Sequence, residues 1–256
     1  MNIRNMETIR REFLHSYNNG DTVEDKSGCR VIELLGTSFL ANEETLFGLP
    51  NYKYIDHEIS WYYSKSRSVH DIEGITPKIW LEVADSFGLI NSNYGWCIFS
   101  NKRDDPVFHN FAQYHNVVKT LKRDPSSRQA VMIYTRPSMH YDATEDGRSD
   151  FICTNTVQYL LREGKLNAIV NMRSNDVVFG YRNDFAWQFA ILQSLVDDIN
   201  AESSNTRISF GDIIWQTGSL HMYERDFWML DCYNEFGENM SRKDYQNLVE
   251  DLEIHK

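Results

Sequence analysis

The chain has 256 residues, of which 41% are hydrophobic and 13% aromatic. That is enough apolar material for one sizeable core, and no Pro-, Gly- or Ser-rich linker divides it, so a single domain over residues 1–256 is expected. The formal charge of −11 argues against direct nucleic-acid binding, because contacts with phosphates dominate that affinity. No apolar run of about 18 residues predicts a membrane span, and the charged first residues do not form the apolar core of a signal peptide.

Cysteine usage argues against both disulfides and metal binding. The four cysteines are far apart, and their spacing does not match a Cys-x-x-Cys pair or a Cys/His metal site. Free thiols in a reducing cytoplasm are therefore expected, with no metal cofactor. The four residues are Cys29, Cys97, Cys153 and Cys232.

The first half of the chain predicts mainly helices. They span residues 6–18, 57–66, 77–88 and 107–124. The third of them has Pro77 near its start and Gly88 just past its end, which is the usual asymmetry of helix termini. Residues 30–40 predict a strand, with a bulge or bend at Gly36.

The second half is richer in β-branched and aromatic residues. It predicts strands over residues 129–135, 151–161, 165–173 and 206–219, with a hairpin turn at 162–164. Residues 184–200 are apolar almost all round and predict a buried central helix, which Asn183 or Asp184 could cap. Residues 221–236 predict the last long helix. The sum is an α+β fold, in which a predominantly antiparallel or mixed sheet packs against helices.

Several polar residues have both a structural and a chemical explanation. A free cysteine such as Cys153 usually behaves as a small buried hydrophobe, and a nucleophilic role requires a cationic neighbourhood that favours the thiolate. Arg173 and Ser174 could donate hydrogen bonds to a phosphate or belong to a capped loop. Glu58 on a helix is normally a solvated charge. Taken separately, these residues do not decide between the two explanations.

Ten segments in this order form a larger pattern. They are DKSG (25–28), EISWYYSKS (58–66), PKIW (77–80), INSNYGW (90–96), DPSSR (124–128), MIYTRPSM (132–139), DFICTNTVQYL (150–160), VNMRSNDVVFG (170–180), RNDFAWQ (182–188) and GSLHMY (218–223). In these segments the chain resembles the thymidylate synthase superfamily, and more closely the deoxycytidylate (dCMP) hydroxymethylases of T-even phages. The resemblance implies a thymidylate synthase-like fold, a homodimer formed through the sheet, and action in the host cytoplasm.

The resemblance also implies a chemistry. A cysteine thiolate, matched by Cys153, adds to C6 of the pyrimidine ring and makes C5 nucleophilic. C5 then receives a one-carbon unit from the co-substrate 5,10-methylenetetrahydrofolate. A synthase reduces the resulting exocyclic methylene to a methyl group, whereas a hydroxymethylase adds water and gives 5-hydroxymethyl-dCMP. Glu58 matches the glutamate that organises water and proton transfers beside the ring.

Further matches assign the binding residues. Trp80 and Asp176 match positions that line the folate site. The arginine that matches Arg128 comes from the partner subunit in the family, which is why a homodimer is implied. The family usually has a second arginine after it, where this chain has Gln129, and phosphate affinity could be lower as a result. The residues matched to the nucleotide site are Lys26, Arg128, Arg173, Ser174, Asn175, His221, Tyr223 and Tyr94.

Asp184 decides which base is expected. It stands where synthases carry an Asn, whose amide offers the acceptor and the donor that uracil requires. A carboxylate only accepts hydrogen bonds, so Asp184 would pair with the amino group of cytosine and with an N3 that has gained a proton. That proton stabilises the C6 adduct, so the contact strengthens along the reaction. Thr154, where synthases carry His, agrees with the hydroxymethylase branch.

Two alternatives stay open. The first is a thymidylate synthase, or a hydroxymethylase that acts on dUMP or CMP. Asp184 and Thr154 argue against the synthase. The second is a non-catalytic nucleotide-binding subunit of a nucleotide-synthesising complex. The presence of Cys153, Glu58 and Asp184 together argues against it.

The charged segment EDLEIHK at 250–256 differs from the apolar end that closes synthase sites, and a looser closure would admit water.

Overall fold

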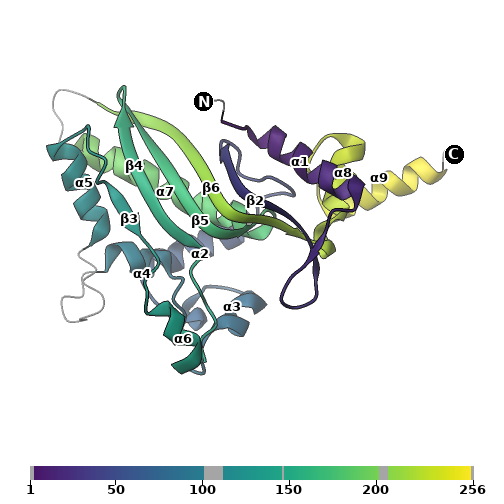
Figure 1. Cartoon of the computed structure of the whole chain (residues 1–256), viewed down its shortest axis with the longest axis horizontal. Helices are drawn as coiled ribbons and strands as arrows, with labels where there is room; N and C mark the ends of the chain where they lie inside the picture. Colours follow the sequence, from purple (N-terminus) through teal and green to yellow (C-terminus); the bar gives the residue numbers. More distant parts are fainter. Residues whose placement is uncertain (1–2, 101–111, 146, 202–206, 255–256) are drawn as a thin grey trace.

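The computed structural model of the chain describes residues 3–100, 112–145, 147–201 and 207–254. Its centre is a six-stranded sheet in the order β1-β2-β6-β5-β4-β3 (Figure 1). Neighbouring strands are antiparallel except β5 and β6, which are parallel. The predicted α+β fold with a mixed sheet is therefore confirmed.

The secondary structure of the described ranges comprises strands, α-helices and two short 3₁₀ turns. The strands are β1 (Val23–Glu24), β2 (Arg30–Leu40), β3 (Val131–Ile133), β4 (Thr154–Arg162), β5 (Lys165–Asp176) and β6 (Ser209–Tyr223). The α-helices are α1 (Met6–Asn19), α2 (Tyr52–Ser64), α3 (Lys78–Val83), α4 (Tyr94–Phe99), α5 (Gln113–Arg123), α6 (Met139–Glu145), α7 (Phe179–Ala201), α8 (Trp228–Phe236) and α9 (Arg242–Ile254). Among these helices, none is both long and apolar enough to cross a membrane.

Two features predicted from glycine positions are confirmed. The β4–β5 hairpin turns at Glu163 and Gly164, whose φ angles of 53° and 74° are the positive values of a type I′ turn. Gly36 in β2 has a φ of 60°, so the strand bends there as the sequence predicts. Gly164 and Gly36 use conformations that glycine adopts at little steric cost, whereas Glu163 is a non-glycine residue with positive φ.

The central helix α7 begins at Phe179, earlier than the predicted residue 184. Asn183 and Asp184 therefore lie within its first two turns, and the prediction that one of them caps the helix is wrong. The early start follows from tertiary packing. Tyr181 is fully buried and packs edge-to-face on Trp215 of β6, with 5.3 Å between the ring centroids.

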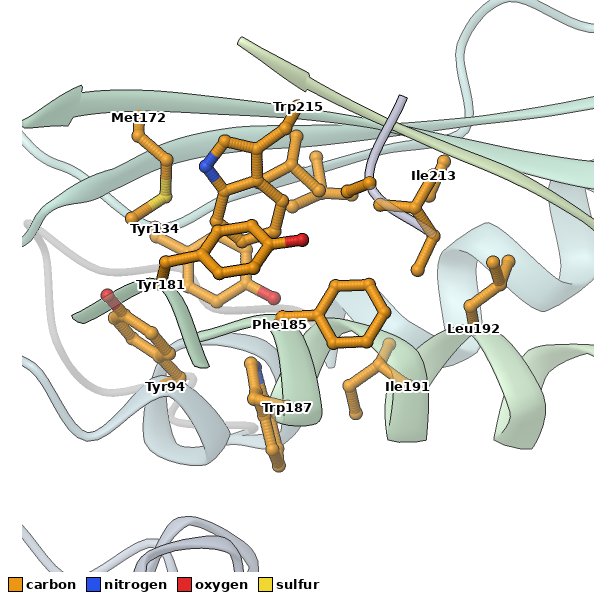
Figure 2. Packing of buried hydrophobic residues seen from close by; sticks show 14 of the residues in the cluster. Tyr94, Tyr134, Met172, Tyr181, Phe185, Trp187, Ile191, Leu192, Ile213 and Trp215 are labelled. Carbon is orange, nitrogen blue, oxygen red and sulfur yellow. The ribbon is translucent and has the colours of Figure 1, made fainter. Parts of the chain in front are cut away.

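Both sides of α7 are covered, which explains why its sequence is apolar almost all round. On one side, Phe185 lies below Trp215 of the sheet (Figure 2). On the other side, Trp187 packs edge-to-face on Tyr62 of α2 and on Phe99 of α4, at 5.1 and 6.3 Å between centroids. The core thus has three layers, with α7 between the sheet and the shorter helices.

The predicted helix over residues 221–236 is wrong in its first part. β6 continues to Tyr223, and α8 begins only at Trp228. Leu220 and Met222 are fully buried and alternate with more exposed residues, which is the period of two expected of a strand. Val31 of β2 lies opposite Tyr223, and β5 pairs with the other edge of β6. These partners come from remote parts of the chain, so the local pattern does not reveal them.

Other predicted elements differ at their ends. α2 begins at Tyr52 instead of residue 57, and α3 ends at Val83 because Ala84 adopts extended backbone. α5 begins at Gln113, and the earlier part of that predicted helix, residues 107–111, lies outside the described residues. The short helices α4 and α6 and the last helix α9 were not predicted.

Candidate active site

Most of the predicted site residues meet at one end of the sheet. β5 and β6 are parallel, so their carboxyl ends coincide, and Asp176 lies opposite His221. β4 is antiparallel to β5, so the start of β4 lies at this end too. There the backbone N–H of Arg173 donates to the carbonyl oxygen of Cys153 at 2.8 Å. The turn that carries Lys26 precedes β2, whose start pairs with the end of β6.

Cys153 lies in a bend just before β4, so the strand predicted over residues 151–161 begins only at Thr154. The guanidinium of Arg173 donates to the carbonyl oxygens of Phe151 and Ile152 at 2.6 and 3.1 Å, and its Nη2 lies 3.6 Å from Sγ of Cys153. Burial raises the pKa of the Cys153 thiol to about 12, while the charge of Arg173 opposes the rise. The cation that a nucleophilic cysteine requires is therefore present, although alone it does not outweigh burial.

Glu58 is 4% exposed, so it is not the solvated surface charge that its helix position suggests. The hydroxyl of Tyr54, one turn earlier on α2, donates to Oε1 of Glu58 at 2.7 Å. Nε1 of Trp80 on α3 donates in turn to the Tyr54 oxygen at 3.0 Å. Burial raises the pKa of Glu58 to about 7, and these hydrogen bonds together with the charge of Arg182 oppose the rise.

Asp184 points from the first turns of α7 toward the end of β5. Nδ2 of Asn175 donates to Oδ2 of Asp184 at 2.8 Å, and Nε1 of Trp215 donates to Oδ1 of Asn175 at 3.2 Å. Burial, followed by the negative charge of Glu58, raises the pKa of Asp184 to about 8. A carboxyl with this pKa holds its proton at neutral pH and can also give it up.

Tyr94 connects the carboxyl of Asp184 to the neighbourhood of the thiol. Its hydroxyl is hydrogen-bonded to Asp184 and to the side chain of Thr154, the residue after the candidate nucleophile. Its ring stacks on Tyr62 of α2, with 5.1 Å between the centroids. α4 approaches α2 so closely that a Cβ on Gly95 would lie 1.8 Å from the carbonyl oxygen of Tyr62. Only glycine allows this approach, which fixes the position of Tyr94.

The candidates for phosphate binding do not all lie together. Lys26, Arg173 and Ser174 reach the end of the sheet at which Cys153 lies. Arg128 precedes β3 and lines a surface depression with residues of the β4–β5 hairpin, at the other end of β4. Because a strand rises about 3.3 Å per residue, this depression is roughly 25 Å from Cys153 of the same chain.

His221 and Tyr223 lie on β6, with their rings edge-to-face at 5.2 Å between centroids. Asp176, at the end of β5, is the cross-strand partner of His221, and the carboxyl and the imidazole interact electrostatically. Burial lowers the pKa of His221, and the negative charge of Asp176 opposes this. Asp176, which is matched to the folate site, is thus adjacent to His221, which is matched to the deoxyribose site.

Two residues of the site, Tyr54 and Trp215, were not predicted from the sequence. Tyr54 and Glu58 are four residues apart on one helix, a spacing that places side chains on the same face, so this pair could have been found. Trp215 is far from Asn175 in the sequence, and no local pattern connects them.

The arrangement suits covalent catalysis with proton transfer. A thiol next to a cation can act as a nucleophile, and two buried carboxyls with raised pKa values can exchange protons near neutral pH. Within the described ranges, no group of His, Cys, Asp and Glu side chains is arranged to hold a metal ion.

Comparison with known proteins agrees with this fold and identifies the family. The thymidylate synthase family matches residues 12–251, and the chain belongs to that family. The deoxycytidylate 5-hydroxymethyltransferase of Enterobacteria phage T4 is 52% identical over 241 residues, which are 94% of this chain and 95% of that protein. The protein of the same name from phage T2 is 51% identical over the same shares. A thymidylate synthase of Buchnera aphidicola subsp. Schizaphis graminum is 26% identical over 216 residues, 80% of this chain and 75% of that protein.

Proposed function

We propose that this protein transfers a one-carbon unit from 5,10-methylenetetrahydrofolate to C5 of dCMP and hydrates it, forming 5-hydroxymethyl-dCMP. The observation that carries the proposal is the buried carboxyl of Asp184, whose pKa of about 8 suits a group that shares a proton with cytosine N3. The two relatives named deoxycytidylate 5-hydroxymethyltransferase support the same substrate. Because these relatives are phage proteins, the host cytoplasm is the proposed place of action.

Cys153 is the proposed nucleophile. Its sulfur would form a bond to C6, while the electron pair of the C5–C6 double bond moves toward C4 and N3. The S–C6 bond would break again when the product is released. The thiol must first lose its proton, and the guanidinium of Arg173, 3.6 Å from Sγ, favours the thiolate. A further arginine in the phosphate site would also favour the thiolate through its positive charge.

Asp184 is proposed to hold the opposite edge of the base. The thiolate addition increases electron density on N3, and a proton shared between N3 and Asp184 neutralises it. Asn175 and Tyr94 both hydrogen-bond this carboxyl and favour its ionised form, so the proton can pass to N3. Uracil presents an N3–H donor and an O4 acceptor instead, and the carboxylate would oppose O4.

Glu58 is proposed to organise the water that adds to the new C5 substituent. A pKa of about 7 allows a carboxylate to accept a proton from water and to return it at neutral pH. General acid–base catalysis is most effective when the pKa of the group lies near the working pH. Burial beside the ring site would keep bulk water away from this exchange.

The folate supplies the one-carbon unit, and Trp80 is the proposed wall of its site. The chain offers a suitable surface: Trp80 packs edge-to-face on Trp61 at 5.7 Å between centroids, and its N–H is bonded to Tyr54, so the ring is held in place. Ile79, its neighbour on α3, is 58% exposed and extends the apolar surface. A flat aromatic ring system can stack on such a surface. Asp176 is the second proposed folate contact.

The sugar and phosphate of the nucleotide are proposed to lie along the ends of β5 and β6. His221 and Tyr223 would hold the 3′-hydroxyl of the deoxyribose, and Lys26, Arg173 and Ser174 would bind the phosphate. Hydroxyl, guanidinium and ammonium donors of this kind suit a phosphate with two negative charges.

We infer that a homodimer completes the phosphate site, with Arg128 supplied by the partner subunit, because a separation of roughly 25 Å within one chain is too long for a side chain to span. Mixing inactive Cys153→Ser chains with Arg128→Ala chains tests this inference. Each mixed dimer contains one site with both residues intact, so activity should recover to roughly a quarter of the wild-type value. Activity no higher than that of Arg128→Ala alone would contradict the shared site.

Tritium release from C5-labelled dCMP tests the proposed reaction. The wild type should release tritium and form 5-hydroxymethyl-dCMP without the absorbance change of dihydrofolate formation. Cys153→Ser should abolish release, whereas Cys232→Ser, which changes a buried thiol of α8, should retain it. Formation of dTMP and dihydrofolate from dUMP would identify a synthase instead. Absence of release from both nucleotides would identify a non-catalytic nucleotide-binding protein.

A further inference from the structure

Three side chains form a hydrogen-bonded row that ends on Glu58. Nε1 of Trp80 lies 3.0 Å from the Tyr54 oxygen, and that oxygen lies 2.7 Å from Oε1 of Glu58. Tyr54 and Glu58 share one face of α2, while Trp80 comes from α3. The half-buried Tyr54 therefore connects the proposed wall of the folate site to the carboxyl beside the pyrimidine.

The indole fixes the direction of this row. An indole N–H can only donate, so the Tyr54 oxygen accepts from Trp80 and its own O–H is directed at the carboxyl. Oε1 of Glu58 is consequently an acceptor, and a proton carried by Glu58 belongs on Oε2. The terminal torsion of a glutamate is broad, so one short hydrogen bond also sets the plane of the carboxyl group.

We propose that Tyr54 is a positioning residue for the hydration step: it holds Oε1 of Glu58 as a fixed acceptor, so that Oε2 alone exchanges protons with the attacking water. This inference rests on the proposed function, in which Glu58 organises that water. Tyr54 touches Glu58 and Trp80 and acts through them. Its role is therefore to orient a proton-transferring group and to set its proton affinity.

Trp80 also lowers the pKa of Glu58 through a side-chain hydrogen bond, and the remaining groups around Glu58 act on it through charge. Arg182 of α7 lowers the pKa of Glu58, and its Nη1 also donates to the backbone carbonyl of Leu49 at 2.9 Å. Asp184 of α7 and Tyr62 of α2 interact with Glu58 electrostatically. Loss of the Tyr54 hydroxyl would leave burial less opposed, so the pKa of Glu58 would rise further.

The pH dependence of Tyr54→Phe tests the proposal. The rate of 5-hydroxymethyl-dCMP formation should fall about 10- to 100-fold at neutral pH, and its acidic limb should move up by about one pH unit. KM for dCMP should change little, because the nucleotide contacts remain. Tyr52→Phe is the matched control: it removes a phenol hydroxyl from the same helix that bonds Glu44 at the surface, at 2.6 Å. The control should keep the wild-type profile.

The possible results are distinguishable. A rate that is lower at every pH, with the acidic limb in its wild-type place, would mean a merely structural role and would overturn the proposal. If Tyr54→Phe does not fold, 3,5-difluorotyrosine incorporated at position 54 provides a stronger donor of nearly the same shape. It should move the limb to lower pH, and an unmoved limb would again overturn the proposal. Failure of the proposed function itself would be seen in the wild type, as absence of tritium release from dCMP.

Discussion

The two buried carboxyls of the site, Glu58 and Asp184, are supported in similar ways. Each accepts a hydrogen bond from a neutral side chain, Tyr54 for Glu58 and Asn175 for Asp184. Each of those neutral groups is in turn oriented by the N–H of a tryptophan from another element. An indole N–H cannot accept, so in both cases it determines which atom faces the carboxyl.

Their electrical surroundings differ, and this separates their roles. Burial raises both pKa values, to about 8 for Asp184 and to about 7 for Glu58. The negative charge of Glu58 adds to the rise at Asp184, whereas the positive charge of Arg182 opposes the rise at Glu58. Because the two groups interact, they titrate as a pair, and both take part in proton exchange near neutral pH. Similar hydrogen-bonded support thus gives one carboxyl suited to the base edge and one suited to water.

Among the substitutions of the two carboxyls, Asp184→Asn should have the largest effect, and that effect is on the preference for dCMP over dUMP. Asn has nearly the same shape but presents an amide donor, which fits uracil O4 and not the amino group of cytosine. The ratio of kcat/KM for dCMP to that for dUMP should fall by about 10³–10⁵. Tritium release from both C5-labelled nucleotides measures the ratio. An unchanged ratio would exclude Asp184 as the group that reads the base.

Glu58→Gln should have a smaller and different effect. Gln retains an oxygen that accepts from Tyr54 but cannot exchange a proton, so product formation should fall by about 10²–10⁴. The preference for dCMP over dUMP and the Kd for dCMP should stay near their wild-type values. A change of preference as large as that of Asp184→Asn would mean that both carboxyls read the base.

The smallest expected effect is on thermal stability as a function of pH, which tests the raised pKa of Asp184. The folded chain keeps the Asp184 proton up to a pH of about 8, whereas an unfolded Asp loses it near pH 4. The folded state therefore binds the extra proton between these values, and this contribution to the free energy of unfolding falls as the pH rises.

Asp184→Asn lacks this contribution. Its Tm relative to the wild type should therefore increase from about pH 4 to about pH 8 and then level off. Thermal unfolding of both chains across this range measures the difference. The same Tm difference at every pH would contradict the raised pKa of Asp184.

The sequence by itself determined those elements whose signal is local. The apolar run of α7, the turn at Glu163 and Gly164, and the bend at Gly36 each depend on neighbouring residues, and each appears in the structure. The order of the motifs also indicated the thymidylate synthase family, which the match over residues 12–251 confirms. The roles of Cys153 and Asp184 remain predictions that the tests above address.

Only the tertiary structure decided features that join remote residues. Residues up to Tyr223 are strand because β2 and β5 pair with them, although their local pattern predicts a helix. The bond between Trp215 and Asn175 and the distance of Arg128 from Cys153 likewise follow from the order of strands in the sheet. Burial sets the pKa values of both carboxyls, and burial depends on how the whole chain packs, not on the residues beside them in the sequence.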